Sequence, residues 1–200
     1  MGMTKAVQER LFVRANLDAE RTRFICVRYG NVLASRGSVI PLFKEQIRSG
    51  GPVTITTPEM TRFLLTLNEA VDTIFAALRE ATPGETYVPR CPAARVTDIA
   101  SVLIGDRKIQ TTVTGIRPGE KIHEVLVSEE EAHRTVRRGD YYAVAPILPE
   151  LRRPDTPGEK LGAEYNSADH VVDVAGLTEL LSKRGLLDDA RGSDEEELLV

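Results

Sequence analysis

Polar side chains that could hold an anionic ligand follow a short apolar run near the start of the sequence. Residues 24–27 are apolar and rich in β-formers, and Arg28, Tyr29 and Asn31 come directly after them. Such a run predicts a strand buried on both faces of a sheet, and polar groups at the carboxyl end of a parallel strand lie where open α/β sheets bind ligands. Gly30 would let the backbone approach a ligand closely. An ordinary strand-to-helix connection is the alternative interpretation.

Two further arginines stand in the same relation to later β-rich runs. Arg62 follows the run 53–56, and Arg117 follows the run 109–113, with Glu120 three residues beyond it. Two arginines brought from separate loops to one sheet edge could clamp a diphosphate through bidentate contacts. Glu120 would then suit a ribose diol. Each arginine taken alone is more often part of a surface ion pair, so the prediction of an anionic ligand depends on their acting together.

The elements that must position these side chains alternate between helix and strand, which predicts an α/β fold. The apolar spacing predicts helices over residues 1–17 (with Glu9 facing away from the apolar stripe), 40–49, 69–80, 96–104, 129–136 and 174–183, and a helix from the 115–124 segment to about residue 126. Further strands are expected at 53–56, 85–88, 109–113 and 141–144. In the helix 69–80, capped by 66–69, the residues expected to face inward are Ala70, Val71, Ile74, Phe75 and Leu78.

Composition excludes several classes of protein. The 200 residues carry a formal net charge of −4 and are 42% hydrophobic, so a general nucleic-acid binder is not expected. Cys26 and Cys91 form no CxxC pair, which argues against a metal or disulfide framework and for a reducing, cytoplasmic compartment. We expect no metal and no membrane span, because no apolar run reaches the length that a span needs. A strand–GxGxxG–helix fingerprint for a dinucleotide is absent from the sequence.

Five motifs in order give the chain a specific resemblance to one family. They are Met-Gly-Met-Thr-Lys at 1–5, Arg-Tyr-Gly-Asn-Val at 28–32, Gly-Ser-Val-Ile-Pro at 37–41, Met-Thr-Arg-Phe at 60–63 and Ile-Arg-Pro-Gly-Glu-Lys-Ile-His-Glu at 116–124. Over residues 1–145 the chain resembles the nucleotide-sugar 4,6-dehydratases, extended short-chain dehydrogenases of bacterial polysaccharide biosynthesis. The resemblance implies the C-terminal part of that fold: the end of a Rossmann sheet plus a smaller α/β substrate-binding domain. The implied division is a Rossmann remnant at 1–33, a nucleotide-sugar-binding portion at 34–150, and an extension at 151–200 with a helix and a disordered acidic tail.

The resemblance also implies roles for individual residues. Lys5 would hold the nicotinamide ribose of NAD or NADP, and Met1 stands where most relatives have the catalytic tyrosine. The residues implied to bind the UDP-sugar are Asn31, Val39, Ile40, Pro41, Arg62, Arg117 and Glu120, with Arg28 a candidate from its place at the strand end. Judged by spacing alone, Met1 and Lys5 are a start residue and a surface lysine.

Since the motifs of the cofactor-binding half are not in the sequence, the resemblance predicts a truncated 4,6-dehydratase that is inactive alone. A 4-epimerase of the same superfamily, a non-catalytic UDP-sugar-binding module paired with a separate Rossmann chain, and a remnant without function are the alternatives. A homo-oligomer is possible in each case.

Overall fold

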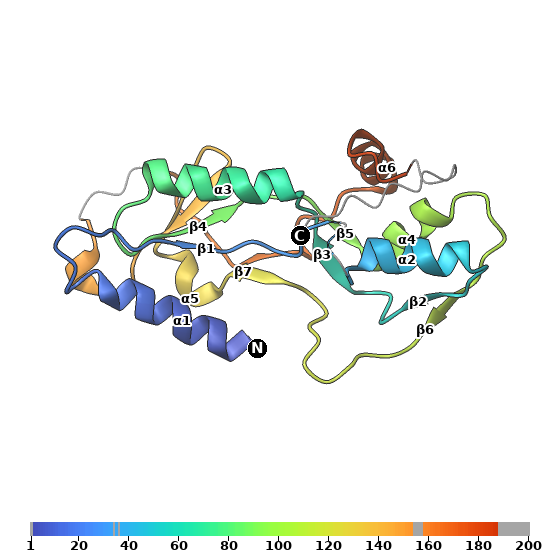
Figure 1. Cartoon of the computed structure of the whole chain (residues 1–200), viewed down its shortest axis with the longest axis horizontal. Coiled ribbons are helices and arrows are strands. Elements are labelled where there is room, and N and C mark those ends of the chain that lie inside the picture. The colour runs from blue at the N-terminus through green and yellow to red at the C-terminus, as the bar shows by residue number, and fades with distance from the viewer. Residues whose placement is uncertain (1, 34, 36, 154–157, 188–200) are drawn as a thin grey trace.

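The computed structural model describes residues 2–33, 35, 37–153 and 158–187 and shows an elongated α/β molecule with two lobes (Figure 1). Met1 and the acidic tail at 194–197 lie outside the described residues. The α/β fold expected from the alternation of elements is confirmed. Each lobe is built from several separated segments of the chain.

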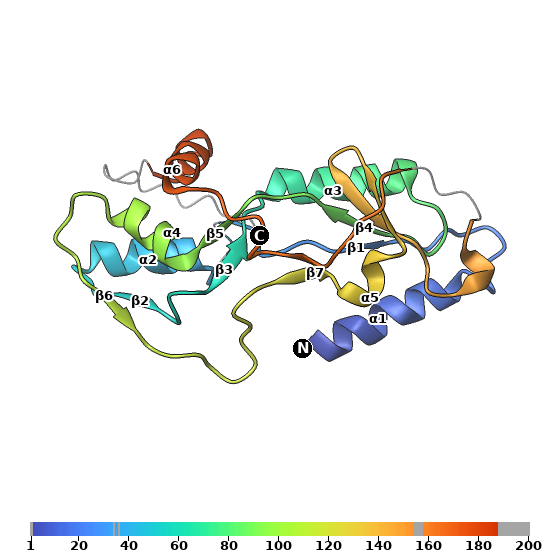
Figure 2. The ribbon, with the colours of Figure 1, turned by 180° about the vertical axis from the view of Figure 1, so that it is seen from behind.

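The first lobe is organised around a four-stranded sheet with the order β1-β4-β9-β8. Strand β1 (Cys26–Val27) is parallel to β4 (Thr86–Pro89), whereas β9 (Tyr141–Val144) is antiparallel both to β4 and to β8 (Thr135–Arg138). Helices α1 (Gly2–Ala15) and α3 (Leu67–Glu80) lie on opposite sides of β1, as Figures 1 and 2 both show.

The second lobe combines a two-stranded parallel sheet with three helices. Strand β2 (Val53–Ile55) pairs with β6 (Thr111–Val113). The helices are α2 (Val39–Arg48), α4 (Val96–Ile104) and α6 (Val174–Lys183). Their shared core contains side chains that are at most 1% exposed, among them Phe43, Ile99, Leu177 and Leu181. The bounds of α4 and α6 agree with the predicted helices.

Two short antiparallel pairs join the lobes. Strand β3 (Thr61–Phe63) pairs with β5 (Ala93–Arg95), and β7 (Val125–Val127) pairs with β10 (Tyr165–Asn166). Helix α5 (Glu129–Ala132) and the 3-10 turn η1 (Pro149–Leu151) complete the described elements. Phe63 and Tyr165 stack in this region with ring centroids 4.9 Å apart. These strands share a packed core with the sheet of the first lobe, through residues such as Val88 and Val144, and this core fixes β3 against that sheet.

Helix α3 begins where predicted, but the face of the helix that packs on the sheet is the opposite of the predicted one. Thr66 and Glu69 form a complete capping box, as their spacing indicates. The residues that face the sheet are small: Ala70, Thr73, Ala76 and Ala77. Ala70 is buried, as predicted. The large apolar side chains that were also expected to face inward are instead 38–52% exposed: Val71, Ile74, Phe75 and Leu78. The prediction was wrong because small side chains allow close packing of this helix on the sheet.

Four other local predictions were also wrong. The strand at 24–27 is reduced to the two residues of β1, which are half-buried because β1 is an edge strand. The helix expected after the 115–124 segment is strand β7, and the helix expected over 129–136 ends at residue 132 before β8. Glu9 does not face away from the fold, because it is ion-paired with Arg28.

Candidate functional site

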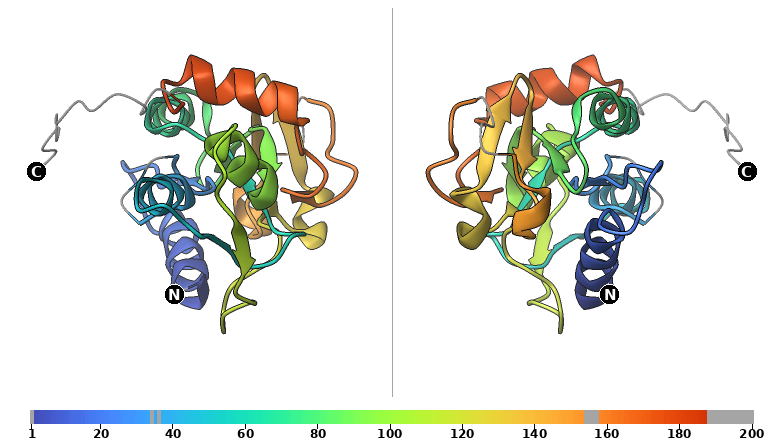
Figure 3. Two further views of the ribbon diagram at one scale, coloured as in Figure 1. Left: turned by 90° about the vertical axis from the view of Figure 1, so that its right-hand side faces the viewer. Right: turned by 90° about the vertical axis from the view of Figure 1, so that its left-hand side faces the viewer.

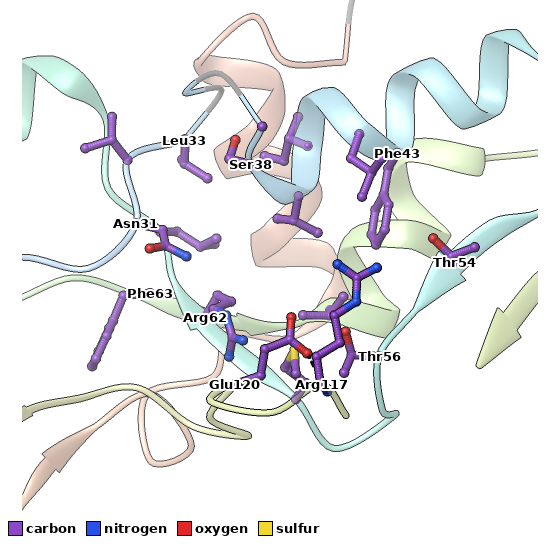
Figure 4. A pocket seen from close by; sticks show the side chains of 18 of the residues that line it. Asn31, Leu33, Ser38, Phe43, Thr54, Thr56, Arg62, Phe63, Arg117 and Glu120 are labelled. Carbon is purple, nitrogen blue, oxygen red and sulfur yellow. Dashed lines mark hydrogen bonds between the residues drawn. The ribbon is translucent and has the colours of Figure 1, made fainter. Parts of the chain in front are cut away.

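A cavity of about 260 Å³ lies where α2, β2 and β3 meet the loop that follows β6. Figure 4 shows Asn31, Ser38 and Arg62 at the cavity together with Arg117 and Glu120, which come from a single loop. The remaining lining residues are Val32, Leu33, Gly37, Val39, Ile40, Leu42, Phe43, Thr54, Thr56, Met60, Phe63, Leu64, Val96 and Thr114. The concave wall thus combines apolar and polar surface in similar amounts, with several polar side chains converging on it, as in sites that bind small polar molecules.

The loop that carries Arg117 and Glu120 is held by a tight turn over residues 117–120. The Glu120 N–H donates to the Arg117 carbonyl (3.0 Å), and Gly119 has φ +86°. Proline at the second position and glycine at the third are what a type II turn requires. The Glu120 carboxylate also accepts from the Arg117 N–H at 3.1 Å. The Arg117 guanidinium has no partner among the described residues, so it is available to an anionic ligand.

Arg62 approaches the same cavity from β3. Its Nη1 donates to the carbonyls of Thr61 (2.7 Å) and Ile122 (3.2 Å). Within the described part of the chain, no partner is found for its Nε and Nη2. The contact with Ile122 also ties β3 to the end of the loop carrying Arg117, since the Thr61 N–H donates to the same carbonyl at 3.0 Å. The Ile122 carbonyl therefore fixes β3 beside the end of the loop that carries Arg117.

The amino-terminal end of α2 opens onto the cavity. Ser38 is its N-cap residue, yet the Ser38 side chain caps no backbone N–H, and its Oγ is buried without a hydrogen-bond partner among the described residues. The N–H groups of Val39 and Ile40 begin the helix and have no acceptor within it. Pro41 does not line the cavity. A helix start with unpaired donors favours a negatively charged group.

Three threonines in the wall, Thr54, Thr56 and Thr114, were not anticipated from the sequence. They reach the cavity because β2 and β6 pair in parallel and the pairing continues past both strands, with the Thr114 N–H donating to the Ile55 carbonyl at 2.8 Å. The only sequence indication was that both runs are β-branched.

Gly30 is needed for a close approach, but to protein rather than to ligand. A Cβ at this position would lie 2.9 Å from the Phe63 Cβ and 3.2 Å from Glu124 Oε2. Glu124 in turn accepts from the Phe63 N–H at 2.9 Å. Burial raises the pKa of the Glu124 carboxyl, and the Phe63 N–H and the charge of Arg62 only partly oppose this. Glu124 thereby fixes β3 where Gly30 packs against Phe63.

Arg28 is placed outside the cavity. Its guanidinium makes bidentate contacts with Glu9 (2.5 and 2.7 Å) and with Glu131 (2.6 and 2.8 Å), and it also donates to the Leu126 carbonyl. Burial alone would raise the pKa of Glu131, but the hydrogen bonds and charge of Arg28 outweigh it and lower this pKa to about 2. The structure thus gives Arg28 the role of joining α1 and α5 to the sheet, and we propose no ligand contact for it.

The described residues do not fit a dinucleotide cofactor. Lys5 is exposed on α1 and does not line the cavity, and no strand–GxGxxG–helix turn is present in the sequence. We therefore assign no cofactor-dependent step to this chain.

His123, another residue of the 115–124 motif, contacts the Thr61 hydroxyl at 2.9 Å instead of the cavity. In the described ranges no cluster of three or more His, Cys, Asp or Glu side chains could hold a metal ion. Nor does any described helix have the length and apolarity needed to cross a membrane.

Comparison with known protein families shows the family to which the chain belongs. Residues 1–146 match the family described as "Polysaccharide biosynthesis protein". The chain belongs to this family, whose members resemble extended short-chain dehydrogenases.

Two curated relatives have different named activities. The "UDP-N-acetylglucosamine 4,6-dehydratase (inverting)" of Campylobacter jejuni is 39% identical over 150 residues, which are 74% of this chain and 44% of that protein. The "UDP-glucose 4-epimerase" of Rickettsia massiliae is 43% identical over 148 residues, 72% of this chain and 43% of that protein. The chain therefore spans less than half the length of these relatives.

A solved structure supports the same assignment of the fold. Pen from Bacillus thuringiensis superposes with a TM-score of 0.82 at 31% identity, covering 93% of this chain and 58% of Pen. The similarity at both levels places the chain within the fold of nucleotide-sugar dehydratases and epimerases.

Proposed function

We propose that the cavity binds the nucleotide diphosphate of a UDP-sugar. Arg62, Arg117 and the N–H groups that begin α2 would hold the diphosphate, because each offers at least one donor that has no acceptor among the described residues. Glu120 would accept from the ribose hydroxyls. The convergence of two arginines and a helix start on one concave site is the observation that carries this proposal.

Asn31 and the apolar wall would complete the site. Asn31 is exposed at the mouth of the cavity and can hydrogen-bond a phosphate or sugar oxygen. Leu33, Phe43 and Met60 offer apolar surface for the base or the sugar ring. Val39 and Ile40 contribute through backbone donors and side-chain packing, whereas Pro41 would act by fixing the path of the first helical turn.

For the reaction, we infer a part in nucleotide-sugar 4,6-dehydration in which this chain supplies the substrate-binding portion. The dehydratase relative of Campylobacter jejuni supports this inference, as do the motifs at 28–32 and 116–124. A 4-epimerase is the second candidate, favoured by the Rickettsia relative of similar identity. Both reactions use NAD or NADP in the family, so Lys5 and Met1 would act only when a cofactor-binding half is present. In its absence the chain would be a UDP-sugar-binding module without catalysis.

Isothermal titration of the purified chain tests the binding proposal. UDP and UDP-N-acetylglucosamine should bind, whereas uridine and free N-acetylglucosamine should bind far more weakly because they lack the diphosphate. Arg62→Met and Arg117→Met should each weaken UDP binding roughly 10- to 100-fold, the value of a charge-assisted hydrogen bond or two. Arg137→Met is the matched control, because Arg137 is exposed on β8 away from the cavity. Equal affinities for wild type and both cavity variants would overturn the proposal.

A further inference from the structure

Three side chains that do not line the cavity meet next to Arg62. Thr61 belongs to β3, His123 lies near the end of the 115–124 segment, and Ser167 directly follows β10. Thr61 and Ser167 are 3% and 0% exposed, and His123 is half-buried. Thr61 Oγ1 lies 2.9 Å from His123 Nδ1 and 2.6 Å from Ser167 Oγ. These three side chains are here called the hydroxyl–imidazole chain. Figure 3 shows the molecule from its two ends, with β3 and the C-terminal helix α6 in the same half.

The contacts fix the direction in which the two hydroxyls donate. Ser167 Oγ accepts from the Glu124 N–H at 2.9 Å. Its own hydrogen can be donated to Thr61 Oγ1 at 2.6 Å or to the Thr61 carbonyl at 3.3 Å. The first distance alone lies in the usual range of about 2.5–3.0 Å for an O–H donor. The Thr61 hydroxyl therefore accepts from Ser167 and donates to His123 Nδ1, and a neutral imidazole that accepts at Nδ1 carries its proton on Nε2.

Ser167 also connects the two backbone segments that hold the Arg62 guanidinium. Its N–H donates to the Glu124 carbonyl at 2.8 Å, while its Oγ accepts from the Glu124 N–H. Its side chain reaches Thr61 at the same time. Arg62 Nη1 donates to the carbonyls of Thr61 and Ile122, one on each of the connected segments. The direction of the guanidinium therefore depends on how these segments are placed relative to each other.

We propose that Ser167 is a positioning residue for Arg62 and that it acts through Thr61 and His123. The hydroxyl–imidazole chain holds the two carbonyls that accept from Arg62 Nη1, which leaves Nε and Nη2 available at the cavity. Ser167 lies outside residues 1–146, which match the family, so a segment without any lining residue contributes to the site. The effect on ligand affinity rests on the diphosphate site proposed above, whereas the effect on the Arg62 side chain does not.

A purely structural role of Ser167 predicts a different result. Removing a buried hydroxyl costs stability wherever it lies, because its partner is left unsatisfied. Thr135 of β8 in the first lobe provides the matched case, since it is 0% exposed and its Oγ1 donates to the Glu131 carbonyl at 2.8 Å. Thr135→Val should therefore lower the free energy of unfolding without any change at Arg62.

Nitrogen NMR of the labelled chain without nucleotide tests the proposal first. At about pH 8, above the usual titration range of imidazole, long-range nitrogen–proton correlations should place the His123 ring proton on Nε2. Thr61→Val should give a mixture of tautomers and lower the order parameter of the Arg62 side chain, whereas Thr61→Ser, which keeps the hydroxyl, should restore both. Ser167→Ala should lower the Arg62 order parameter in the same way. Thr135→Val should change neither observable.

Calorimetry with UDP then measures the consequence for the site. Ser167→Ala should weaken UDP binding about 3- to 10-fold, the value of one hydrogen bond. In an Arg62→Met background the same substitution should change the affinity by less than about twofold, because effects that act through one residue are not additive. Thr135→Val should leave the affinity unchanged.

Three results would overturn the proposal. They are a His123 ring proton on Nδ1 in the wild type, an unaltered Arg62 order parameter in both Ser167→Ala and Thr61→Val, and equal weakening of UDP binding by Ser167→Ala with and without Arg62. A wild-type chain that bound no UDP would instead contradict the proposed function, and the measurements without nucleotide would still decide the role of Ser167.

Discussion

Replacing Arg28 by methionine should destabilise the fold without acting through the cavity. Arg28 makes four contacts with the carboxylates of Glu9 and Glu131 at 2.5–2.8 Å. The side chains of these two glutamates are only 20% and 10% exposed. Removing the guanidinium leaves both carboxylates close together with most of their water already excluded. Breaking a buried pair in this way costs about 3–5 kcal/mol. Arg134 still contacts Glu131 at 2.9 Å in the variant, so we expect a loss near 3 kcal/mol.

The pH dependence of this loss has a definite sign. The pKa of Glu131 lies at about 2, below its ordinary value of 4.5. A carboxyl whose pKa is lower in the folded state contributes stability above its unfolded pKa and loses it as the pH falls through the folded value. This lowering of the pKa corresponds to about 3 kcal/mol of folding stability before screening by solvent, and to about 1–2 kcal/mol once screening is included. The difference in the free energy of unfolding between wild type and Arg28→Met should therefore be largest at pH 7 and should decrease from about pH 4.5 downward.

Urea unfolding followed by circular dichroism at pH 7, 5, 4 and 3 measures both effects. Arg137→Met is the control, because Arg137 is 47% exposed and its pair with Glu159 is 3.9 Å long. That substitution should change the free energy of unfolding by less than about 0.5 kcal/mol. The reasoning is refuted if Arg28→Met costs no more than the control, or if its cost is the same at pH 3 as at pH 7. UDP affinity, measured where the variant is fully folded, should stay unchanged.

Three further predictions concern residues that shape the cavity. Gly30→Ala should lower the free energy of unfolding, measured by urea titration, by about 1–3 kcal/mol, since its Cβ would lie 2.9 Å from the Phe63 Cβ. Gly162→Ala, with no heavy atom within 4 Å of the added Cβ, is the control and should be nearly neutral. Glu124→Gln should flatten the pH dependence of stability, because burial raises the pKa of Glu124, so that its contribution to the free energy of unfolding is full below its unfolded pKa and is lost as the pH rises through the raised value. Thermal melts from pH 4 to 8 whose melting temperatures depend on pH as in wild type would contradict this. Gly119→Ala, at φ +86°, should strain the turn by about 1 kcal/mol or more and weaken UDP binding in calorimetry, and an unchanged affinity would show that the turn does not set the position of Arg117.

Much of the local structure could be predicted from the sequence where a local rule decides it. The bounds of α4 and α6 follow from apolar spacing, and the start of α3 follows from the capping pair Thr66 and Glu69. The 115–124 segment was mistaken for a helix start because Pro118 and Gly119 serve equally well in a turn, and only the pairing of the following strand with β10 decides between them.

The orientation of α3 could not be predicted, because both of its stripes are apolar. Large side chains on one stripe and alanines on the other satisfy the same helical spacing, and the choice depends on how closely the sheet approaches. The direction in which the Arg28 side chain points also depends on tertiary structure. It points to Glu131 rather than into the cavity, and Glu131 lies 103 residues away in the sequence. Likewise, Thr54 and Thr114 share the cavity only through the β2–β6 pairing.

The central claim is that the cavity between α2, β3 and the loop 114–120 is a nucleotide-diphosphate site, and a UDP titration of the isotopically labelled chain by amide NMR tests it most directly. The account predicts saturable shifts at Asn31, Val39, Ile40 and residues 114–120, and their loss in Arg117→Met. Residues of β8 and β9, which lie in the other lobe, should not shift. Absence of shifts at millimolar UDP, or shifts confined to surfaces outside this cavity, would contradict the claim.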